Sequence, residues 1–401
     1  MFPVALLSIE HARAEVLAAT GRLGAERVAI DDALDRVLAR DLRAQGDVPS
    51  FPSSAMDGYA VTAGPAGRTL PVRGESRAGH PYREPLAANC AVRISTGAVV
   101  PDGADAVIRQ EDVEERNGAV WTRKAVAPGE NIRTPGEDLR AGQVVLAAGT
   151  VLGAGELGAA VAAGAGVLAV ARRPRATILC TGDELRAPGE PLGPGEIHNS
   201  NAPMLVAMAR RCGALAPAAG RLPDEPGATR EALAEALATS DVVIVTGGVS
   251  VGPHDHVKPA LAALGVAERF WGVALRPGKP TWFGTLAETL VFGLPGNPVS
   301  AAVTFSLFVA PALRRLQGAP ETPPLEPEAV LAAPVRRSPE REQALRVRLE
   351  RSGAQLLAHP HERQGSHIVT SLLGADALAL LAPGVGVAPP GERVRLWELV
   401  R

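Results

Sequence analysis

The spacing of apolar residues changes along the chain, and each change predicts a different kind of structure. Residues 8–20 and 31–42 carry apolar side chains at helical spacing and predict two amphipathic helices. Within residues 41–138, short alternating runs lie between many glycines and prolines, a pattern typical of a small β-rich domain. Helical spacing returns at 139–173. We therefore predict a mixed helical N-terminal domain, residues 1–40 and 139–173, that is interrupted by the β-rich insertion.

A second pattern, strands alternating with helices, runs from about Arg175 to residue 318. ATILC, DVVIVT and TLVFGL are buried-strand runs, whereas NAPMLVAMARRCG, with a cap near Asn201, and ATREALAEALATS have helical spacing. The unit closes on a long helix, for which Asn297 is the expected cap and Pro298 the first residue. Residues 174–318 therefore predict a doubly wound α/β domain.

The last part of the chain, residues 319–401, begins with a proline-rich linker and returns to alternating patterns. ALRVRLE and ERVRLWELV alternate apolar and charged side chains, and Ser352-Gly353 is a turn signal between strands. This pattern predicts a small C-terminal β-domain. The expected fold class is thus multidomain, α/β plus β.

Composition narrows the class of protein. The 401 residues are 46% hydrophobic and 21% charged with a formal net charge of -2, which favours neither nucleic acid nor an anionic membrane as a partner. Cys90, Cys180 and Cys212 are too widely spaced for a disulfide framework and suit a reducing compartment. The apolar run 157–171 is too short to span a bilayer, and the N-terminus lacks a basic signal-peptide region. We expect a cytoplasmic protein.

Lysine is rare, because only Lys124, Lys258 and Lys279 are lysines among the 41 basic residues. A retained lysine suggests a position that needs a compact ammonium with three donors. Lys258 and Lys279 both adjoin glycine-bearing loops.

Five polar clusters follow or adjoin the predicted α/β strands. They are residues 181–184, Asp224, 246–258, 276–280 and 295–298. Ligands of open α/β sheets bind at the carboxyl ends of the strands, beside helix N-termini. We expect these clusters to share one pocket.

The loop TGGVSVG, residues 246–252, admits several interpretations. It is neither a Walker A loop nor a GxGxxG loop, but it matches G-x-S-x-G, which would make Ser250 a hydrolase nucleophile. That site needs a helix starting at the serine, and Pro253 and Pro259 prevent one. The histidines it would need, His359, His361 or His367, lie beyond the proline-rich linker.

An anion cradle explains the loop better. Gly247 and Gly248 let backbone N–H groups approach a phosphate, Ser250 adds a hydroxyl donor, and Lys258 and Lys279 neutralise charge. Three carboxylates, Glu184, Asp224 and Asp255, suit Mg²⁺ bridging phosphate oxygens. The alternative for each carboxylate is a helix cap or a solvated turn. His254 and His256 could suggest zinc, but no third ligand accompanies them.

Six motifs occur in the order found in one enzyme family. PSFPSSAMDGYAV, RISTGAVVPDGADAV, CTGDEL, TGGVSVG, RPGKP and GLPGNPVSA lie between residues 49 and 301. The chain resembles molybdopterin molybdenumtransferases, the family of bacterial MoeA and the E domain of animal gephyrin. The resemblance extends from the N-terminal helices through GSH at 365–367 to the final strands.

The resemblance implies an α/β molybdopterin-binding domain and an activity. The family inserts molybdate into adenylylated molybdopterin with a divalent cation, releasing AMP. It works as a homodimer whose cleft lies between the α/β domain of one subunit and the β-rich domain of the other. Expected partners are the molybdopterin adenylyltransferase that supplies the substrate, and apo-molybdoenzymes or their chaperones.

Site residues are carried over by the same resemblance. Asp57 and Thr96 would reach the cleft from the partner subunit, Glu184 and Asp224 would bind Mg²⁺, and Asp255 would act near the scissile phosphate or position the pterin. The expected substrate-binding residues are Gly247, Gly248, Ser250, Lys258, Lys279, Pro295, Asn297, Pro298, Ser300 and Asn201.

The sequence departs from the family pattern at three positions. Asn199 stands where an aspartate is usual, Arg276 replaces a common lysine, and His256 replaces a frequent tyrosine. An amide cannot supply a metal's countercharge, so the resemblance does not carry a metal role to position 199.

Two other functions compete with molybdate insertion. A cofactor-adenylylating enzyme shares the α/β domain but lacks the flanking domains, and a non-enzymatic scaffold would not need the acidic residues. No residue distinguishes molybdate from tungstate.

Overall fold

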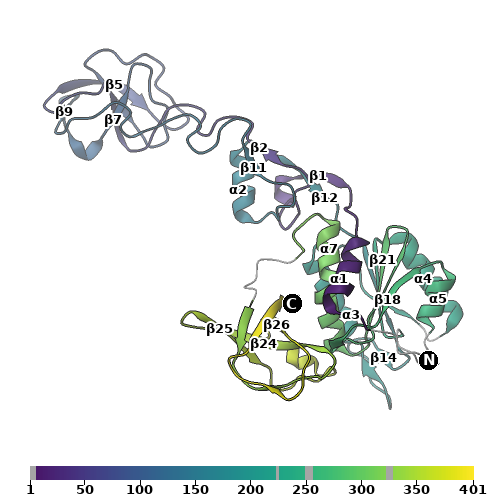
Figure 1. Ribbon diagram of the computed structural model, residues 1–401. Coiled ribbons are helices and arrows are strands. Elements are labelled where there is room, and N and C mark those ends of the chain that lie inside the picture. The colour runs from purple at the N-terminus through teal and green to yellow at the C-terminus, as the bar shows by residue number, and fades with distance from the viewer. Residues whose placement is uncertain (1–5, 223–224, 249–255, 322–327) are drawn as a thin grey trace. The chain divides into compact units, whose positions relative to one another are not determined.

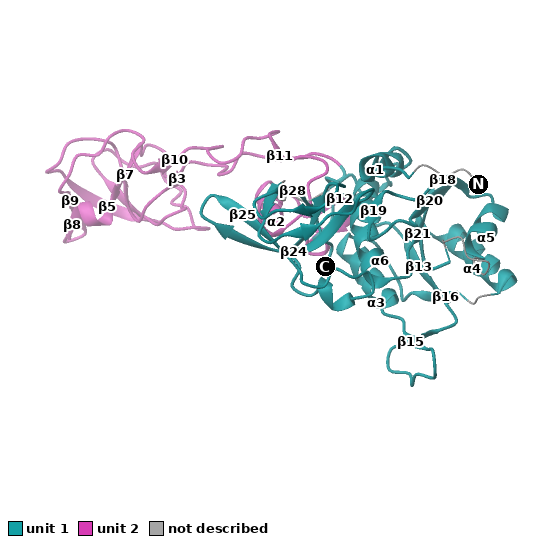
Figure 2. Ribbon diagram, turned by 60° about the horizontal axis from the view of Figure 1, so that its bottom comes forward, with its two compact units in different colours: residues 1–26, 35–39, 170–401 teal, residues 27–34, 40–169 magenta. Residues whose placement is uncertain are grey.

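The computed structural model describes residues 1–401 except 1–5, 223–224, 249–255 and 322–327. The chain forms two compact units (Figure 2). One comprises residues 1–26, 35–39 and 170–401, and the other comprises residues 27–34 and 40–169. Each unit is described by itself. The four-domain division predicted from the sequence is finer than this split and stays a prediction.

The smaller unit contains a six-stranded sheet in the order β7-β4-β6-β5-β9-β8. Its strands are β4 (Gly58–Val61), β5 (Thr69–Ser76), β6 (Ala91–Ile94), β7 (Ala106–Arg109), β8 (Val113–Arg116) and β9 (Ala119–Thr122). Tyr59 and Val61 pack on one face and Ala60 on the other, because successive side chains of a strand alternate. The predicted β-rich segment thus forms one sheet with an apolar cluster on each face.

Short elements complete this unit. They are η1 (Ile30–Asp32), η2 (Gln110–Asp112), β3 (Ser53–Ser54) paired with β10 (Ile132–Arg133), β2 (Leu42–Arg43) paired with β11 (Val144–Leu146), and α2 (Ala154–Ala162). The Glu156 carboxylate accepts the Gly153 N–H at 3.0 Å and caps α2. β1 (Ala25–Ala29) and β12 (Val167–Ala171) lie where the chain passes between the units.

The helix predicted over residues 31–42 is wrong. Only the single turn η1 forms there, and Asp35 has a positive φ of 59°. Arg36 is buried in this segment, where it pairs with Glu26 and donates to the Ala171 carbonyl at 2.9 Å. The apolar residues of this segment recur at helical spacing, but they are buried in turns that tertiary contacts hold in place, so no helix forms. The helix predicted at 8–20 is confirmed as α1 (Ile9–Ala18), which Ser8 caps by accepting the His11 N–H.

The larger unit contains an α/β sheet in the order β16-β13-β17-β21-β20-β18. Its strands are β13 (Ala176–Thr181), β16 (Gly220–Leu222), β17 (Val242–Thr246), β18 (Ala267–Trp271), β20 (Trp282–Leu286) and β21 (Thr289–Leu294). The first four in sheet order are parallel, whereas β20 and β18 are antiparallel to their neighbours. The predicted doubly wound domain is confirmed, and its last two strands, β20 and β18, are antiparallel.

Helices cover both faces of this sheet (Figure 1). α4 (Pro226–Thr239) and α5 (Val257–Ala263) pack on the face that presents Val243 and Val245. The other face, with Ile244 and Phe292, packs against α1, α3 (Asn201–Arg211) and a long helical run. Burial on both faces explains why the central strands are continuously apolar.

The long helical run consists of α6 (Pro298–Thr304), the π-turn η3 (Phe305–Val309) and α7 (Ala310–Leu316). The Ala310 N–H bonds to Phe305 five residues back, a wider turn that suits Pro311, whose ring clashes with a regular helix. By length and composition this run alone, among the described residues, could cross a membrane. However, 89% of its most apolar window is buried, so it is the core helix of the domain.

The C-terminal part forms a closed five-stranded barrel. Its strands follow one another around the barrel as β24 (Glu342–Ser352), β25 (Gln355–Pro360), β22 (Glu328–Leu331), β28 (Arg393–Glu398) and β26 (Ala377–Leu381), and β26 pairs back with β24. The accessory elements are β19 (Leu275–Arg276), which pairs with β24, β23 (Val335–Arg336) with β27 (Val387–Ala388), and η4 (Val369–Leu372). Trp397 Nε1 donates to the Ser306 carbonyl at 2.9 Å and attaches the barrel to the core helix.

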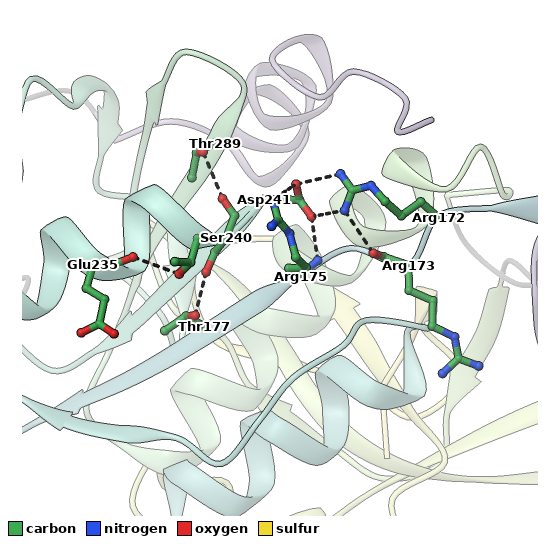
Figure 3. A network of polar contacts seen from close by, with 9 residues as sticks. Arg172, Arg173, Arg175, Thr177, Glu235, Ser240, Asp241 and Thr289 are labelled. Atoms are coloured by element: carbon green, nitrogen blue, oxygen red, sulfur yellow. Dashed lines mark hydrogen bonds and ion pairs between the residues drawn. The ribbon is translucent and has the colours of Figure 1, made fainter. Parts of the chain in front are cut away.

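A polar network ties together the amino ends of β13 and β17 (Figure 3). Arg172 binds both Asp241 carboxylate oxygens at 2.8 and 2.9 Å, and the Arg175 N–H donates to Asp241 at 2.7 Å. Burial alone would raise the pKa of Asp241, but these hydrogen bonds hold it below its ordinary value. The network is structural, because the described loops 181–184, 247–248 and 295–298 lie at the other, carboxyl end of these strands.

Candidate functional site

The parallel strands bring several predicted polar clusters to one edge of the sheet. Cys180 lies opposite Thr246, and Thr246 lies opposite Leu294, so β13, β17 and β21 end level with one another. The antiparallel β20 begins there, since Trp282 lies opposite Gly293. The loops 181–184, 247–248 and 295–298 therefore meet at this edge, and the segment 276–280 reaches it ahead of β20.

Asn201 links two of these loops. Its Nδ2 donates to Thr246 Oγ1 at 3.0 Å and to the Gly296 carbonyl at 2.7 Å. Thr246 Oγ1 in turn donates to the Pro295 carbonyl at 3.1 Å. Asn201 Oδ1 is buried and has no hydrogen-bond partner among the described residues. Because a buried acceptor without a partner is costly, this oxygen can receive a donor from a bound molecule.

Gly247 and Gly248 occupy positions that exclude side chains. Their φ angles are 84° and 63°. A Cβ at Gly247 would lie 2.8 Å from the Thr181 carbonyl oxygen, and one at Gly248 would lie 2.7 Å from Val257 Cγ2. The backbone here therefore packs directly against β13, as a close-approach loop requires.

Three predicted residues of the loops, Asp224, Ser250 and Asp255, lie outside the described residues. The helix that follows Ser250, α5, begins only at Val257. A nucleophile elbow needs its helix to start at the serine, so the position of α5 counts against the hydrolase interpretation. His361 lines a cavity at the mouth of the C-terminal barrel.

Lys258 and Lys279, the two lysines beside glycine-bearing loops, lie in different surroundings. Lys258 Nζ lies 5.0 Å from the centroid of the Trp271 ring, a cation–π contact between α5 and β18. Lys279 is exposed and follows Gly278, where a Cβ would lie 2.7 Å from Thr304 Cγ2. Thr304 is the last residue of α6, so the tight packing of Gly278 places the Lys279 segment beside the C-terminal end of that helix.

The start of α6 corrects one prediction and adds a contact. Pro298 is the first helical residue as expected, but the exposed Asn297 makes no side-chain cap hydrogen bond. The Val299 N–H instead donates to the Ser366 carbonyl of the barrel domain at 3.1 Å. Ser300 is buried, with only 4% of its surface exposed, so it could contact a ligand only from below the surface of the site.

Arg346 is a residue that sequence analysis missed. Its side chain is fully buried on β24 and has no ion pair among the described residues, and burial lowers its pKa to about 10. It donates to Ser371 Oγ at 3.2 Å, and Gln364 bonds to both its backbone N–H and its carbonyl. Arg346 thus holds the loop that delivers Ser366 to α6. In the sequence, the only sign of Arg346 is a charged residue within a strand that alternates apolar and charged side chains.

Glu184 lies just after β13, with its carboxylate folded over Gly182, where a Cβ would come within 2.6 Å of it. Its neighbour Asp183 pairs with Arg221 at 3.3 Å, whereas Glu184 is exposed and has no ion pair among the described residues. No group of three metal-ligating side chains occurs in the described part of the chain. A cation here would need further oxygen ligands.

Asn199 caps the start of helix α3. Two short strands, β14 (Leu185–Arg186) and β15 (Ile197–His198), pair and lead the chain to α3. Asn199 Oδ1 then accepts the Ala202 N–H at 3.0 Å, which satisfies a donor in the first turn of α3. Asn199 rather than Asn201 therefore provides the expected cap.

Asp57 and Thr96 meet in the smaller unit, although 39 residues separate them in the sequence. Asp57 Oδ1 accepts the Thr96 N–H at 2.7 Å and its hydroxyl at 3.1 Å. The neighbouring Phe51 and Met56 are exposed. The pair therefore forms a defined polar feature beside apolar surface.

Comparisons with known proteins agree along the whole chain. Residues 7–164 match the MoeA N-terminal region (domain I and II), residues 177–315 a probable molybdopterin binding domain, and residues 328–399 the MoeA C-terminal region (domain IV). The molybdopterin molybdenumtransferase of Bacillus subtilis is 37% identical, over 92% of this chain and 89% of that protein.

Two further relatives cover almost all of the chain. Molybdopterin molybdenumtransferase 2 of Mycobacterium tuberculosis is 35% identical over 93% of this chain and 94% of its own length. The crystal structure of the molybdopterin biosynthesis moea protein from Pyrococcus horikosii superposes with a TM-score of 0.84. That structure is 32% identical and covers 98% of this chain and 99% of its own.

Proposed function

This chain belongs to the molybdopterin molybdenumtransferase family, and from that premise we propose that it inserts molybdate into adenylylated molybdopterin with Mg²⁺-dependent release of AMP. It is a transferase of molybdenum cofactor biosynthesis. The main support for the proposed insertion reaction is that the loops after β13, β17 and β21 meet around Asn201 at one end of the sheet.

The backbone at this edge suits a phosphate-bearing ligand. Gly247 and Gly248 present main chain without side chains, and α6 begins beside them with Pro298 as its first residue. Helix N-termini and glycine loops favour anions because their N–H groups carry partial positive charge. The Gly247 and Val299 N–H groups are bonded to the Leu294 and Ser366 carbonyls, so the attraction here comes from the helix dipole and the rest of the loop. We infer that the phosphates lie against this loop, that Asn201 Oδ1 accepts a donor of the substrate, and that Lys279 neutralises charge.

Glu184 supports the proposed cation. Mg²⁺ in phosphoryl-transfer sites is held by one or two carboxylates, together with phosphate oxygens and water. An exposed carboxylate at the sheet edge, without a cationic partner among the described residues, fits that mode. Asp224 would be the second ligand. When bound, Mg²⁺ offsets negative charge that develops on the phosphate during cleavage.

We propose a homodimer in which Asp57 and Thr96 of one subunit complete the cleft of the other. Their mutual hydrogen bonds fix one Asp57 oxygen and leave the other to act on substrate. The smaller unit also exposes several large apolar side chains, among them Leu34, Phe51, Met56, Val151 and Val161. We further propose that a molybdopterin adenylyltransferase supplies the substrate and that apo-molybdoenzymes or their chaperones receive the product.

The proposal is tested by following product formation. Purified protein, adenylylated molybdopterin, Mg²⁺ and molybdate, without ATP, should together restore activity to a molybdenum-free apo-enzyme added afterwards. Protein that instead consumes ATP with molybdopterin as co-substrate is an adenylyltransferase. If neither reaction occurs at any molybdate or tungstate concentration, the protein is a scaffold. Adenylyltransferase activity and the absence of both reactions would each overturn the proposal.

A further inference from the structure

A cavity of about 1170 Å³ opens at one mouth of the C-terminal barrel. β22, β25 and β26 end at this mouth and β24 begins there, because β22 runs parallel to β25 while β24 is antiparallel to both β25 and β26. Barrel mouths are frequent ligand sites. Of its lining residues only Arg276, in the segment 276–280, belongs to the candidate site described above.

The cavity carries an excess of positive charge. Arg276, Arg336 and Arg337 line it, against one carboxylate, that of Glu362. Arg337 is paired with Glu392. Arg276 and Arg336 have no ion pair within the described ranges, so two guanidinium groups have donors available for an anionic ligand.

His361 adds a further donor. Its Nδ1 accepts the Arg363 N–H at 3.1 Å. A neutral imidazole that accepts at Nδ1 carries its proton on Nε2, so this ring offers a hydrogen bond without being charged. Arginines and the histidine therefore all donate, whereas Gln364 is already bonded to Arg346 and His361.

Apart from Gln343 and Gln364, the rest of the lining is apolar. Val335, Val385 and Val387 lie at the mouth, and Val385 and Val387 are 92% and 58% exposed. The lining contains no phenylalanine, tyrosine or tryptophan, so a planar pterin or purine would find only the His361 imidazole as an aromatic ring to stack on. A single tetrahedral oxyanion would fill only a small part of the volume. These features favour an extended ligand with carboxylates and aliphatic side chains.

We propose that the barrel mouth binds an acidic peptide segment of a partner protein. The segment's carboxylates pair with Arg336 and Arg276, and its aliphatic side chains cover Val385 and Val387. Bidentate arginine–carboxylate pairs give such a site its specificity. The test can be kept apart from the reaction at the sheet edge, because Arg336 and Val385 belong to the barrel alone, whereas Arg276 lies in the segment 276–280.

The test uses the whole protein and a fluorescein-labelled peptide of about ten residues that alternates glutamate with valine and leucine. Fluorescence anisotropy should show saturable binding. The Arg336→Gln variant should bind roughly tenfold more weakly, the effect of losing one charge-assisted hydrogen-bond pair. Val385→Asp, at an exposed position that folding does not need, should weaken binding similarly by repulsion. Arg348→Gln is the matched control, since Arg348 is exposed on the same barrel outside the cavity.

Three results would overturn the proposal. One is equal binding of a glutamine-for-glutamate peptide, because the carboxylates would then be irrelevant. A second is unchanged affinity in both Arg336→Gln and Val385→Asp, with their folding verified by circular dichroism. The third is displacement of the peptide by inorganic phosphate but not by sodium chloride of equal ionic strength, which would assign the cavity to a small oxyanion.

Discussion

At the scale of single residues, two asparagines near the start of α3 have different roles. Asn199 Oδ1 accepts the Ala202 N–H, whereas Asn201 bonds to Thr246 and Gly296 and keeps a buried oxygen without a partner among the described residues. The first arrangement serves the helix. The second joins the loops of the candidate site, so substitutions at the two positions should have different consequences.

We expect Asn199→Ala to lower the free energy of unfolding by about 1 kcal/mol, as the loss of a helix-capping side chain usually does, with turnover nearly unchanged. Asn201→Ala should lower the rate of AMP release roughly tenfold or more, because it removes two inter-loop hydrogen bonds and the unpartnered acceptor. Denaturant unfolding and AMP release measured on both variants check this contrast. Equal activity losses in the two variants would contradict it.

Asp241 provides a test of the opposite edge of the sheet. Its side chain is 12% exposed and holds Arg172 and the Arg175 N–H. Asp241→Asn should lower the free energy of unfolding by about 2 kcal/mol at neutral pH, because Arg172 loses its charged partner.

The pH dependence of that difference follows from the lowered pKa of Asp241. A carboxylate whose pKa is lowered by folding stabilises the protein above its unfolded pKa of about 4. That stabilisation is lost as the pH falls through the folded value. The difference between wild type and Asp241→Asn should therefore shrink in acid. A difference that is constant from pH 7 to pH 3 would exclude this explanation.

At the scale of elements, glycines decide how closely the β17 loop approaches β13. Gly247→Ala should cost roughly 2 kcal/mol or more and impair substrate binding, because alanine is strained at a φ of 84° and its Cβ would meet the Thr181 carbonyl. Gly155→Ala in α2 is the control, since a Cβ there meets nothing within 4 Å and alanine favours a helix. Thermal unfolding of both variants and titration with substrate give the comparison, and an unaltered Gly247→Ala protein would refute the requirement for glycine.

Element types were predictable where one local pattern dominated. Five apolar or β-branched residues predicted β17 at its observed bounds, Val242–Thr246. Residues 31–42 misled, because the spacing of Ala33, Val37 and Leu38 reflects burial in turns and not a helix. Barrel closure was out of reach from the sequence. It depends on β24 pairing with β26, and nothing in either strand alone specifies that partner.

The candidate site was predictable only in outline. Strand–helix alternation predicted that the loops share an edge. The hydrogen bonds of Asn201, the Asp57–Thr96 pair and the buried Arg346 arise from residues distant in sequence, so single-sequence patterns could not reveal them.

At the scale of the whole molecule, the central proposal is a cleft shared between two subunits. Co-expressed Asp57→Asn and Glu184→Gln chains, carrying different tags, allow the hybrid dimer to be isolated. If each cleft takes Asp57 from one chain and Glu184 from the other, the hybrid has one intact cleft and about half of wild-type activity. Each parent homodimer should be nearly inactive. A hybrid no more active than the parents, yet dimeric by size-exclusion chromatography, would show that both residues act within one chain.

The most direct measurement is AMP release from adenylylated molybdopterin by the purified protein in a single turnover. We predict prompt release that requires both Mg²⁺ and molybdate and is lost in Glu184→Gln, while that variant still binds substrate through the Gly247–Gly248 loop. Binding of substrate without AMP release at every concentration of molybdate and tungstate would contradict the account, and would leave the sheet edge a binding site without catalysis.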